Sequence, residues 1–129
     1  MARVTGIGGV FFKARDAEAL CAWYRTHLGM DIEPWGGVTF RWRDGEASGR
    51  EGVTVWTIFP ASSDYFGPDK ALMINYRVDD LAGVLRLLRE EGCDVEEKVD
   101  ESEFGKFGWV RDPEGNRVEL WEPPPGGSA

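Results

Sequence analysis

The feature of this chain that most constrains its fold is an internal repeat with an offset of 63 residues. The landmarks that recur are an aspartate before a helical pattern, a glycine after it and a proline that closes the half (Asp16 and Asp79, Gly29 and Gly92, Pro60 and Pro123). One half of about sixty residues would leave a sheet face uncovered, so two halves are expected to pair. The repeat therefore predicts an α+β fold built from two β-α-β-β-β modules, with a cleft between equivalent strands.

The length of 129 residues favours a single domain. Its expected parts are module one over about 4–60, a linker over 61–70, module two over 71–123 and a frayed tail over 124–129. The clearest element is the hairpin that closes module two. Asp112-Pro113-Glu114-Gly115-Asn116 supplies its turn, because proline fixes φ and Gly-Asn tolerates positive φ.

In module one, the short apolar run Gly6–Lys13 predicts a strand. A helix is expected over Ala17–Leu28, with Asp16 as its N-cap and Trp23 on its buried face. Met30–Glu33 is expected to begin the next strand.

Module two repeats this order. Ala71–Val78 predicts a strand of alternating faces, and Asp79-Asp80 opens a helix that runs through Glu91. Cys93–Val99 leads into strand, and the acidic run over residues 94–103 is expected to form a solvated edge.

The formal net charge is −8 and the pI about 4.7, which argues against a nucleic-acid or an anionic membrane partner. No apolar run approaches the ~18–20 residues that span a bilayer. Two distant cysteines, Cys21 and Cys93, do not make a disulfide framework, which favours a cytoplasmic setting.

Three stretches of the sequence together resemble the vicinal oxygen chelate superfamily: AWYRTHLGM in the first helix, VDDL at the second helix start, and the terminal DPEGNRVELWEP. This superfamily contains glyoxalase I, extradiol dioxygenases, fosfomycin-resistance enzymes and bleomycin-resistance proteins. The resemblance covers nearly the whole chain. It implies the glyoxalase/bleomycin-resistance fold, a cupped mixed sheet with helices on its outer face, working as a homodimer around a ligand cavity.

Metal-using members of the superfamily take their ligands from the first and last strands of each module. The resemblance places Gly9, Trp56, Met73 and Glu119 at those positions, and only Glu119 is a ligand type. A catalytic divalent metal normally needs three or more protein ligands. The only histidine, His27, lies in the helix motif. No cofactor is therefore expected, and a divalent metal is disfavoured.

Strand alternation directs a set of mainly aromatic side chains into the cavity around Glu119. The expected ligand-binding residues are Phe11, Trp42, Trp56, Met73, Asn75, Arg77, Trp109 and Trp121. Such a slot suits a small aromatic or cationic molecule through stacking, cation–π contacts and one carboxylate. The leading hypothesis is metal-independent binding of the bleomycin-resistance or drug-sequestration type.

Other possibilities stay open. Desolvation would raise the pKa of Glu119 and make it a general acid or base, in a glyoxalase-like or dioxygenase-like enzyme with an incomplete metal site. Alternatively, Glu119 forms a buried ion pair with Arg77. The pair Tyr65-Phe66 in the linker caps a pocket, docks on a partner subunit or packs on its own domain. A purely structural role ranks last.

Overall fold

The computed structural model describes residues 4–43, 51–67 and 70–125, which form one seven-stranded mixed sheet and two helices. The strand order is β2-β3-β1-β4-β7-β6-β5. The elements are β1 Val4–Ala14, α1 Ala17–Leu28, β2 Gly37–Arg43, β3 Glu51–Pro60, β4 Leu72–Val78, α3 Leu81–Glu90, β5 Asp94–Ser102, β6 Gly105–Arg111 and β7 Arg117–Glu122.

The second half has the predicted β-α-β-β-β order (β4, α3, β5, β6, β7), whereas the first half is β-α-β-β (β1, α1, β2, β3) and lacks one predicted strand. In each half, the last strand lies parallel to the first, β3 beside β1 and β7 beside β4. Strands β1 and β4 then pair antiparallel and join the halves at the middle of the sheet. The predicted α+β fold is confirmed.

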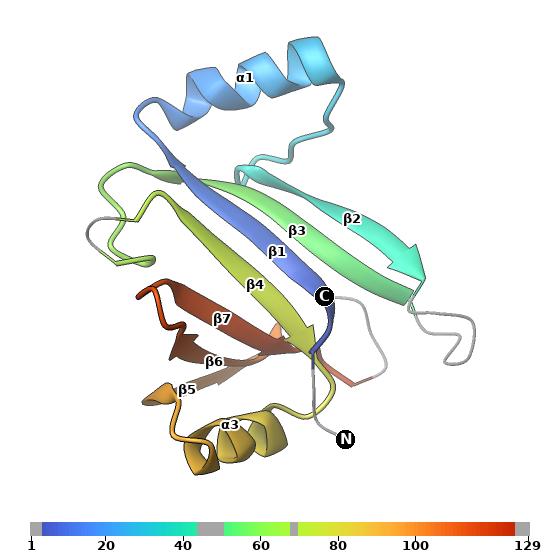
Figure 1. The fold of residues 1–129 in the computed structure, drawn as a ribbon. Coiled ribbons are helices and arrows are strands. Elements are labelled where there is room, and N and C mark those ends of the chain that lie inside the picture. Colours follow the sequence, from blue (N-terminus) through green and yellow to red (C-terminus); the bar gives the residue numbers. More distant parts are fainter. Residues whose placement is uncertain (1–3, 44–50, 68–69, 126–129) are drawn as a thin grey trace.

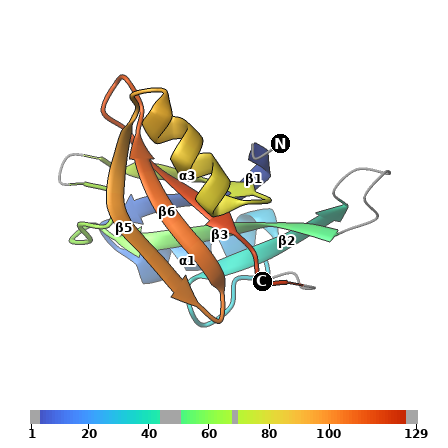
Figure 2. The same ribbon diagram turned by 90° about the horizontal axis from the view of Figure 1, so that it is seen from below.

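The sheet changes direction between the halves. Figure 1 shows β2, β3, β1 and β4 running together, while β7, β6 and β5 cross below them, with α1 at the top and α3 at the bottom. The view from below in Figure 2 shows the same crossing. Each helix packs on its own half of the sheet, and the opposite face of the bend is left for the linker and the site.

The first helix begins and ends where the sequence predicts. Asp16 accepts a hydrogen bond from the Ala19 N–H (3.0 Å), and Gly29 ends the helix at φ 65°. The helix turns Cys21 toward the sheet, whereas Trp23 is 49% exposed. The prediction that Trp23 lies in the core is therefore wrong, because its ring lies half in solvent against Tyr24 (5.1 Å) and His27 (5.2 Å) of the same helix.

Residues Met30–Glu33 are not a strand, contrary to the prediction. The side chain of Arg25 donates two hydrogen bonds to the carbonyl of Ile32 (3.2 and 3.0 Å), which satisfies that carbonyl without a neighbouring strand. The Ile32 side chain is buried against Cys21 and Ile58. Local side-chain bonding thus replaces strand pairing here.

The second helix is shorter than predicted by one residue, ending at Glu90. Asp80 is its N-cap and accepts from the Gly83 N–H (3.1 Å). Its buried face packs Leu85 against Leu120 of β7, in the core of the second half. No helix in the described ranges has the length and apolarity needed to cross a membrane.

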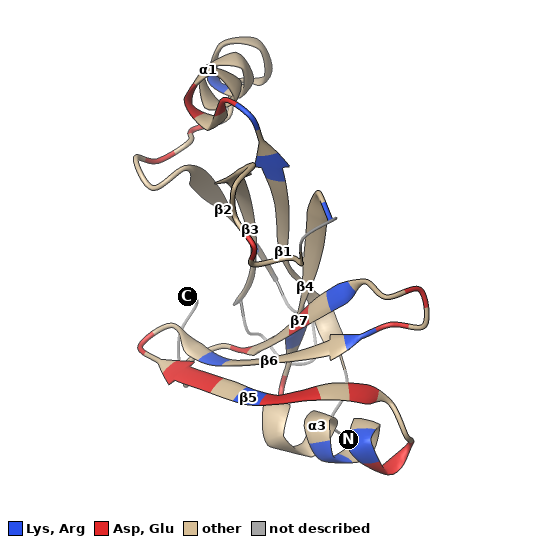
Figure 3. Cartoon of the chain, turned by 90° about the vertical axis from the view of Figure 1, so that its left-hand side faces the viewer, with Lys and Arg blue, Asp and Glu red and all other residues tan. Residues whose placement is uncertain are grey.

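The acidic run is a solvated edge, as predicted. Figure 3 shows the red segments of Asp and Glu along β5, the last strand of the sheet. Charged side chains on an edge strand oppose pairing with another chain. Residues 97–104 are exposed along this edge.

Candidate functional site

The structure centres on one buried carboxylate, Glu119 of β7, which is 1% exposed. Asn75 Nδ2 donates to its Oε1 (2.7 Å) and Trp109 Nε1 to its Oε2 (3.0 Å). The phenolic hydroxyl of Tyr65 also donates to Oε2. Three donors converge on one carboxyl group, an arrangement that suits the ionised form, which only accepts hydrogen bonds.

Sheet register positions two of these donors. Parallel pairing of β4 with β7 sets Asn75 opposite Glu119, and antiparallel pairing of β6 with β7 sets Trp109 opposite it from the other side. The third donor, Tyr65, lies in the linker rather than in a strand. Its place depends on the packing of the linker against the sheet.

Aromatic contacts hold the linker in place. Phe66 is 1% exposed and meets the ring of Phe59 at 5.0 Å. The ring of Tyr65 stacks on Phe59 (5.8 Å, 12°) and meets Trp109 edge-on at 6.4 Å. Of the alternatives open for Tyr65-Phe66, packing on its own domain is therefore the one observed, and Tyr65 covers Glu119.

Burial raises the pKa of both Glu119 and Tyr65. Desolvation raises the pKa of Glu119, against the opposing effect of the hydrogen bonds from Tyr65, Asn75 and Trp109 and the charge of Arg117. Burial and the adjacent Glu119 carboxylate also raise the pKa of Tyr65, so the phenol keeps its proton at neutral pH. Tyr65 is thus a donor, and Glu119 is a carboxyl group poised to take up a proton.

Arg117, which the sequence analysis did not predict as a site residue, holds Tyr65 in place over Glu119. Its Nη1 donates to the Tyr65 carbonyl (2.5 Å), and its Nε and Nη2 donate to the two oxygens of Glu96 (both 2.8 Å). The guanidinium lies over the Trp109 ring at 4.7 Å. The available signal was its place two residues before Glu119 on one strand, which puts both side chains on the same face.

Four residues on the neighbouring strands β3, β1, β4 and β7 pair in a row across the sheet. Val55 pairs with Gly9, Gly9 with Asn75, and Asn75 with Glu119. The positions expected from the sequence, Trp56 and Met73, are displaced from this row. Trp56 follows Val55 on β3, and Met73 lies two residues before Asn75 on β4.

The row does not fit a divalent metal. Glycine and valine offer no donor, so Asn75 and Glu119 supply the only side-chain oxygens of the four positions. The described part of the chain contains no group of three or more His, Cys, Asp or Glu residues that could hold a metal ion. A β-carbon at Gly9 would also lie 2.7 Å from the ring of Phe11.

Several of the predicted ligand-binding residues do gather around Glu119. Met73, Asn75 and Trp121 are buried on the same face as Glu119, together with Trp109. Phe11 contacts Phe59, which packs against the linker (5.5 Å). Instead of an open aromatic cup, these side chains and the linker fill the face around the carboxylate.

Trp56 does not belong to this group. Its ring packs against Phe12 (5.1 Å) and Tyr24 (4.8 Å), under helix α1 on the opposite face of the sheet. The prediction that Trp56 lines the cavity is wrong, because alternate residues of β3 face opposite sides and the row passes through Val55.

Trp42 and Arg77 lie together, away from the carboxylate. The Arg77 guanidinium is 5.7 Å from the Trp42 ring and donates to Thr5 Oγ1 (3.4 Å). Trp42 Nε1 donates to Thr54 Oγ1 (2.9 Å). The hydrogen bonds to Glu119 within the described residues come from Tyr65, Asn75 and Trp109, where the sequence had suggested an ion pair with Arg77.

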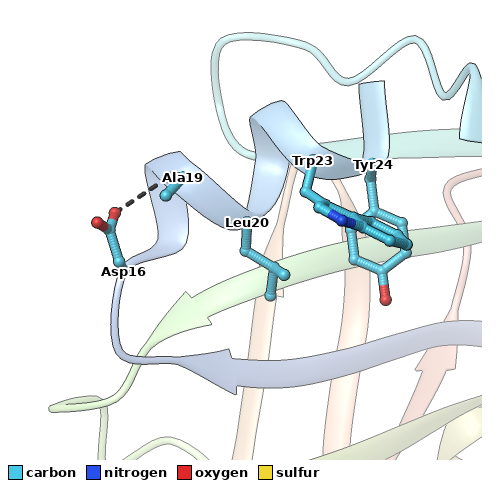
Figure 4. Close-up of a pocket in the computed structure, with 5 residues that line it drawn as sticks. All are labelled: Asp16, Ala19, Leu20, Trp23 and Tyr24. Carbon is cyan, nitrogen blue, oxygen red and sulfur yellow. Dashed lines mark hydrogen bonds between the residues drawn. The ribbon is translucent and has the colours of Figure 1, made fainter. Parts of the chain in front are cut away.

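Two hollows adjoin the sheet. One, of about 380 Å³, lies where β4 and β7 separate and reaches Met73 and Arg117. The other, of about 460 Å³, is an open depression beside α1. Figure 4 shows Leu20, Trp23 and Tyr24 pointing into this second hollow, which lies on the outer face and away from Glu119.

Comparison with known proteins agrees with this geometry. The chain matches the family model of the glyoxalase-like domain over residues 9–121. No curated protein matches it significantly.

Among solved structures, methylmalonyl-CoA epimerase from Mycobacterium tuberculosis is 20% identical with a TM-score of 0.65, over 95% of this chain and 90% of that one. A methylmalonyl-CoA epimerase in complex with methylmalonyl-CoA and ammonium is 14% identical with a TM-score of 0.71, over 98% and 100%. These likenesses establish the fold, and the matched family model places the chain in the family of glyoxalase-like domains of the vicinal oxygen chelate superfamily.

Proposed function

We propose that this protein is an enzyme that moves a proton at a carbon atom next to a carbonyl group of a small molecule, with Glu119 as the acid–base group. The observation that carries the proposal is a fully buried carboxyl whose pKa is raised by desolvation and whose orientation is fixed by three donors. Enzymes named methylmalonyl-CoA epimerases share the fold. An epimerase of this type inverts one stereocentre, which requires removal and return of a proton.

The step uses only side chains of this chain. The ionised Glu119 takes the proton from the substrate C–H, and the electron pair of that bond moves to the carbonyl oxygen to give an enolate. Because Tyr65 covers Glu119, its hydroxyl has to leave the carboxylate before a substrate can approach. Once released, that hydroxyl is a donor for the enolate oxygen. Return of a proton from Glu119 to the other face of the planar enolate, after the enolate has turned over in the site, inverts the carbon, whereas return to the same face regenerates the substrate with its hydrogen exchanged.

No metal takes part in this scheme. A dioxygenase needs a redox metal with several protein ligands, and the row Val55–Gly9–Asn75–Glu119 supplies too few. We therefore favour proton transfer over oxygen chemistry.

A second candidate is binding without chemistry, as in drug sequestration. The absence of donor side chains at Val55 and Gly9 favours it, because a chelating function has no support there. The filled face around Glu119 disfavours it, since a ligand would have to displace Tyr65 and its packing against Phe59.

Deuterium exchange distinguishes the two. The protein would be incubated in D₂O with methylmalonyl-CoA and a panel of other thioesters and 2-oxo acids, and loss of the α-proton signal followed by NMR. Wild-type protein is expected to exchange at least one substrate, and Glu119→Gln to lose about 100-fold or more. The control Glu114→Gln makes the same change at an exposed turn. Exchange that survives Glu119→Gln would refute the role of Glu119, and binding without exchange would favour sequestration.

A further inference from the structure

We infer that Glu96, on the edge strand β5, is a positioning residue for Glu119 and acts on it through Arg117. This inference rests on the proposed function, because it names a residue that orients the proposed acid–base group. Glu96 belongs to the acidic run of β5, but its side chain turns inward from that solvated edge. It is 23% exposed, against 67% for Lys98 and 51% for Asp100.

The contact between Glu96 and Arg117 is a paired one. Nε and Nη2 of Arg117 each donate to a different oxygen of Glu96, both at 2.8 Å. Two parallel bonds fix the plane of the guanidinium as well as its distance from the carboxylate. The hydrogen bond from Arg117 is also the main cause of the lowered pKa of Glu96, so this carboxylate is ionised at neutral pH. Glu96 therefore holds Arg117 in one orientation.

A second arginine increases the need for this carboxylate. The register of β6 and β7 sets Arg111 directly opposite Arg117, so two like charges face each other. Arg111 Nη2 lies 3.7 Å from Oε2 of Glu96, the same oxygen that accepts from Arg117 Nε. Without the charge of Glu96, repulsion between the two arginines is expected to move Arg117.

Arg117 in turn contacts the two rings that donate to Oε2 of Glu119. Its guanidinium carbon lies 4.7 Å from the ring centre of Trp109 and 5.4 Å from that of Tyr65. Trp109 Nε1 and the Tyr65 hydroxyl both donate to this oxygen. Arg117 Nη1 also donates to the Tyr65 carbonyl. Contacts thus run from Glu96 through Arg117 to both donors, and a shift of Arg117 changes how Oε2 is held.

The other oxygen of Glu119 is held from a different strand. Asn75 of β4 donates to Oε1 (2.7 Å). Loss of Glu96 should therefore loosen Glu119 on its Oε2 side only. A carboxylate held on one side spends less time in the orientation that proton removal requires, so kcat should fall. KM should not rise, because a less restrained Tyr65 gives way to the substrate more easily.

The test measures hydrogen–deuterium exchange of indole N–H groups by NMR. The proteins are the wild type, Glu96→Gln and the control Glu97→Gln, which makes the same change at the next, exposed residue of β5. The indole N–H of Trp109 is bonded to Glu119, and in Glu96→Gln it should exchange about fivefold faster or more. Glu97→Gln should exchange like the wild type.

The indole N–H of Trp121 serves as an internal reference. It donates to the Phe104 carbonyl (2.8 Å), at the other end of β6 from Arg111. Its exchange should stay the same in Glu96→Gln, because this bond is outside the contacts of Arg117. Trp109 exchange that stays at the wild-type rate would overturn the inference. Equal acceleration at Trp109 and Trp121 would also overturn it, because it would indicate a general loss of stability.

A second variant tests whether Glu96 acts through Arg117. Arg117→Lys keeps the positive charge but cannot form the two parallel bonds. It should accelerate Trp109 exchange as Glu96→Gln does, and the double variant should be little faster than either single one. Accelerations that multiply in the double variant would show that Glu96 acts by another route and would overturn the inference.

The α-proton exchange assay separates this inference from the proposed function. Glu96→Gln is expected to lower kcat about fivefold or more without raising KM. Faster Trp109 indole exchange in a protein that exchanges no substrate would overturn the proposed function and leave Glu96 as the residue that positions Glu119. Substrate exchange whose kcat is unaffected by Glu96→Gln would overturn the inference and leave the function.

Discussion

The phenolic hydroxyl of Tyr65 donates a hydrogen bond to the carboxylate of Glu119, 54 residues further along the chain. This bond joins the linker between the modules to the last strand of the second module. Arg117 strengthens the connection, because it donates to the Tyr65 carbonyl (2.5 Å) and lies over its ring (5.4 Å). A substrate can therefore reach Glu119 only when the linker moves.

Replacing Tyr65 by Phe should shift the pH dependence of proton exchange. The hydrogen bond from Tyr65 lowers the pKa of Glu119, so its loss raises that pKa further. If ionised Glu119 is the base, the acid limb of the exchange rate should move to higher pH. The profile is measured from about pH 5 to 9 against the control Tyr24→Phe, which alters a tyrosine of α1 that packs on Phe12. An unchanged profile in Tyr65→Phe would contradict the coupling.

Glu119 should make the fold more stable at lower pH. Its pKa is raised in the folded state, so the folded protein binds a proton more tightly than the unfolded chain does, and the stability contribution grows as pH falls through the folded pKa. Glu96 has the opposite effect on stability. The hydrogen bond from Arg117 lowers the pKa of Glu96, so its contribution to stability is lost as pH falls.

Comparison with Glu119→Gln isolates the effect of Glu119. The free energy of unfolding in urea is measured for both proteins between about pH 8 and pH 5. The free energy of unfolding of the wild type minus that of Glu119→Gln should become more positive as pH falls. A difference that stays constant with pH would show that the Glu119 carboxyl titrates normally.

Gly8→Ala should destabilise the protein by about 1–3 kcal/mol. A β-carbon at this position would lie 2.1 Å from Asn75 Oδ1 and 2.8 Å from the ring of Trp121. The loss of stability caused by Gly8→Ala should be smaller in an Asn75→Ala background, because the clash with the Asn75 side chain is then removed. A double-mutant cycle by urea unfolding measures this coupling. Additive costs would mean that Gly8 and Asn75 do not constrain each other.

Trp56 and Trp23 should differ sharply when each is replaced by Ala. Trp56 packs on Phe12 and Tyr24, and its loss should cost about 3 kcal/mol. Trp23 is half-exposed on α1, and its loss should cost less than about 1 kcal/mol. Equal costs in chemical unfolding would contradict the placement of the two rings.

The sequence predicted the elements whose signals are local. The Asp16 cap, the Gly29 stop and the turn at Asp112 depend on chemistry within a few residues, and all three occur as expected. The buried Glu119 followed from its place in the terminal motif.

Features that depend on distant contacts were not predictable in the same way. The row of Val55, Gly9, Asn75 and Glu119 arises from the pairing of β3, β1, β4 and β7, which the repeat in the sequence did not specify. Tyr65 lies in a linker without periodicity, so no pattern indicated which side chain it would meet.

The ring of Phe11 limits which residues position 9 can accept. A β-carbon at Gly9 would lie 2.7 Å from that ring and 3.0 Å from the Val55 carbonyl oxygen. A descendant that gained a histidine at position 9 would clash before it could coordinate anything, unless Phe11 had changed first. A metal ligand at position 9 therefore requires at least two changes, one at Gly9 and one at Phe11, whereas chemistry that uses the carboxylate of Glu119 needs neither.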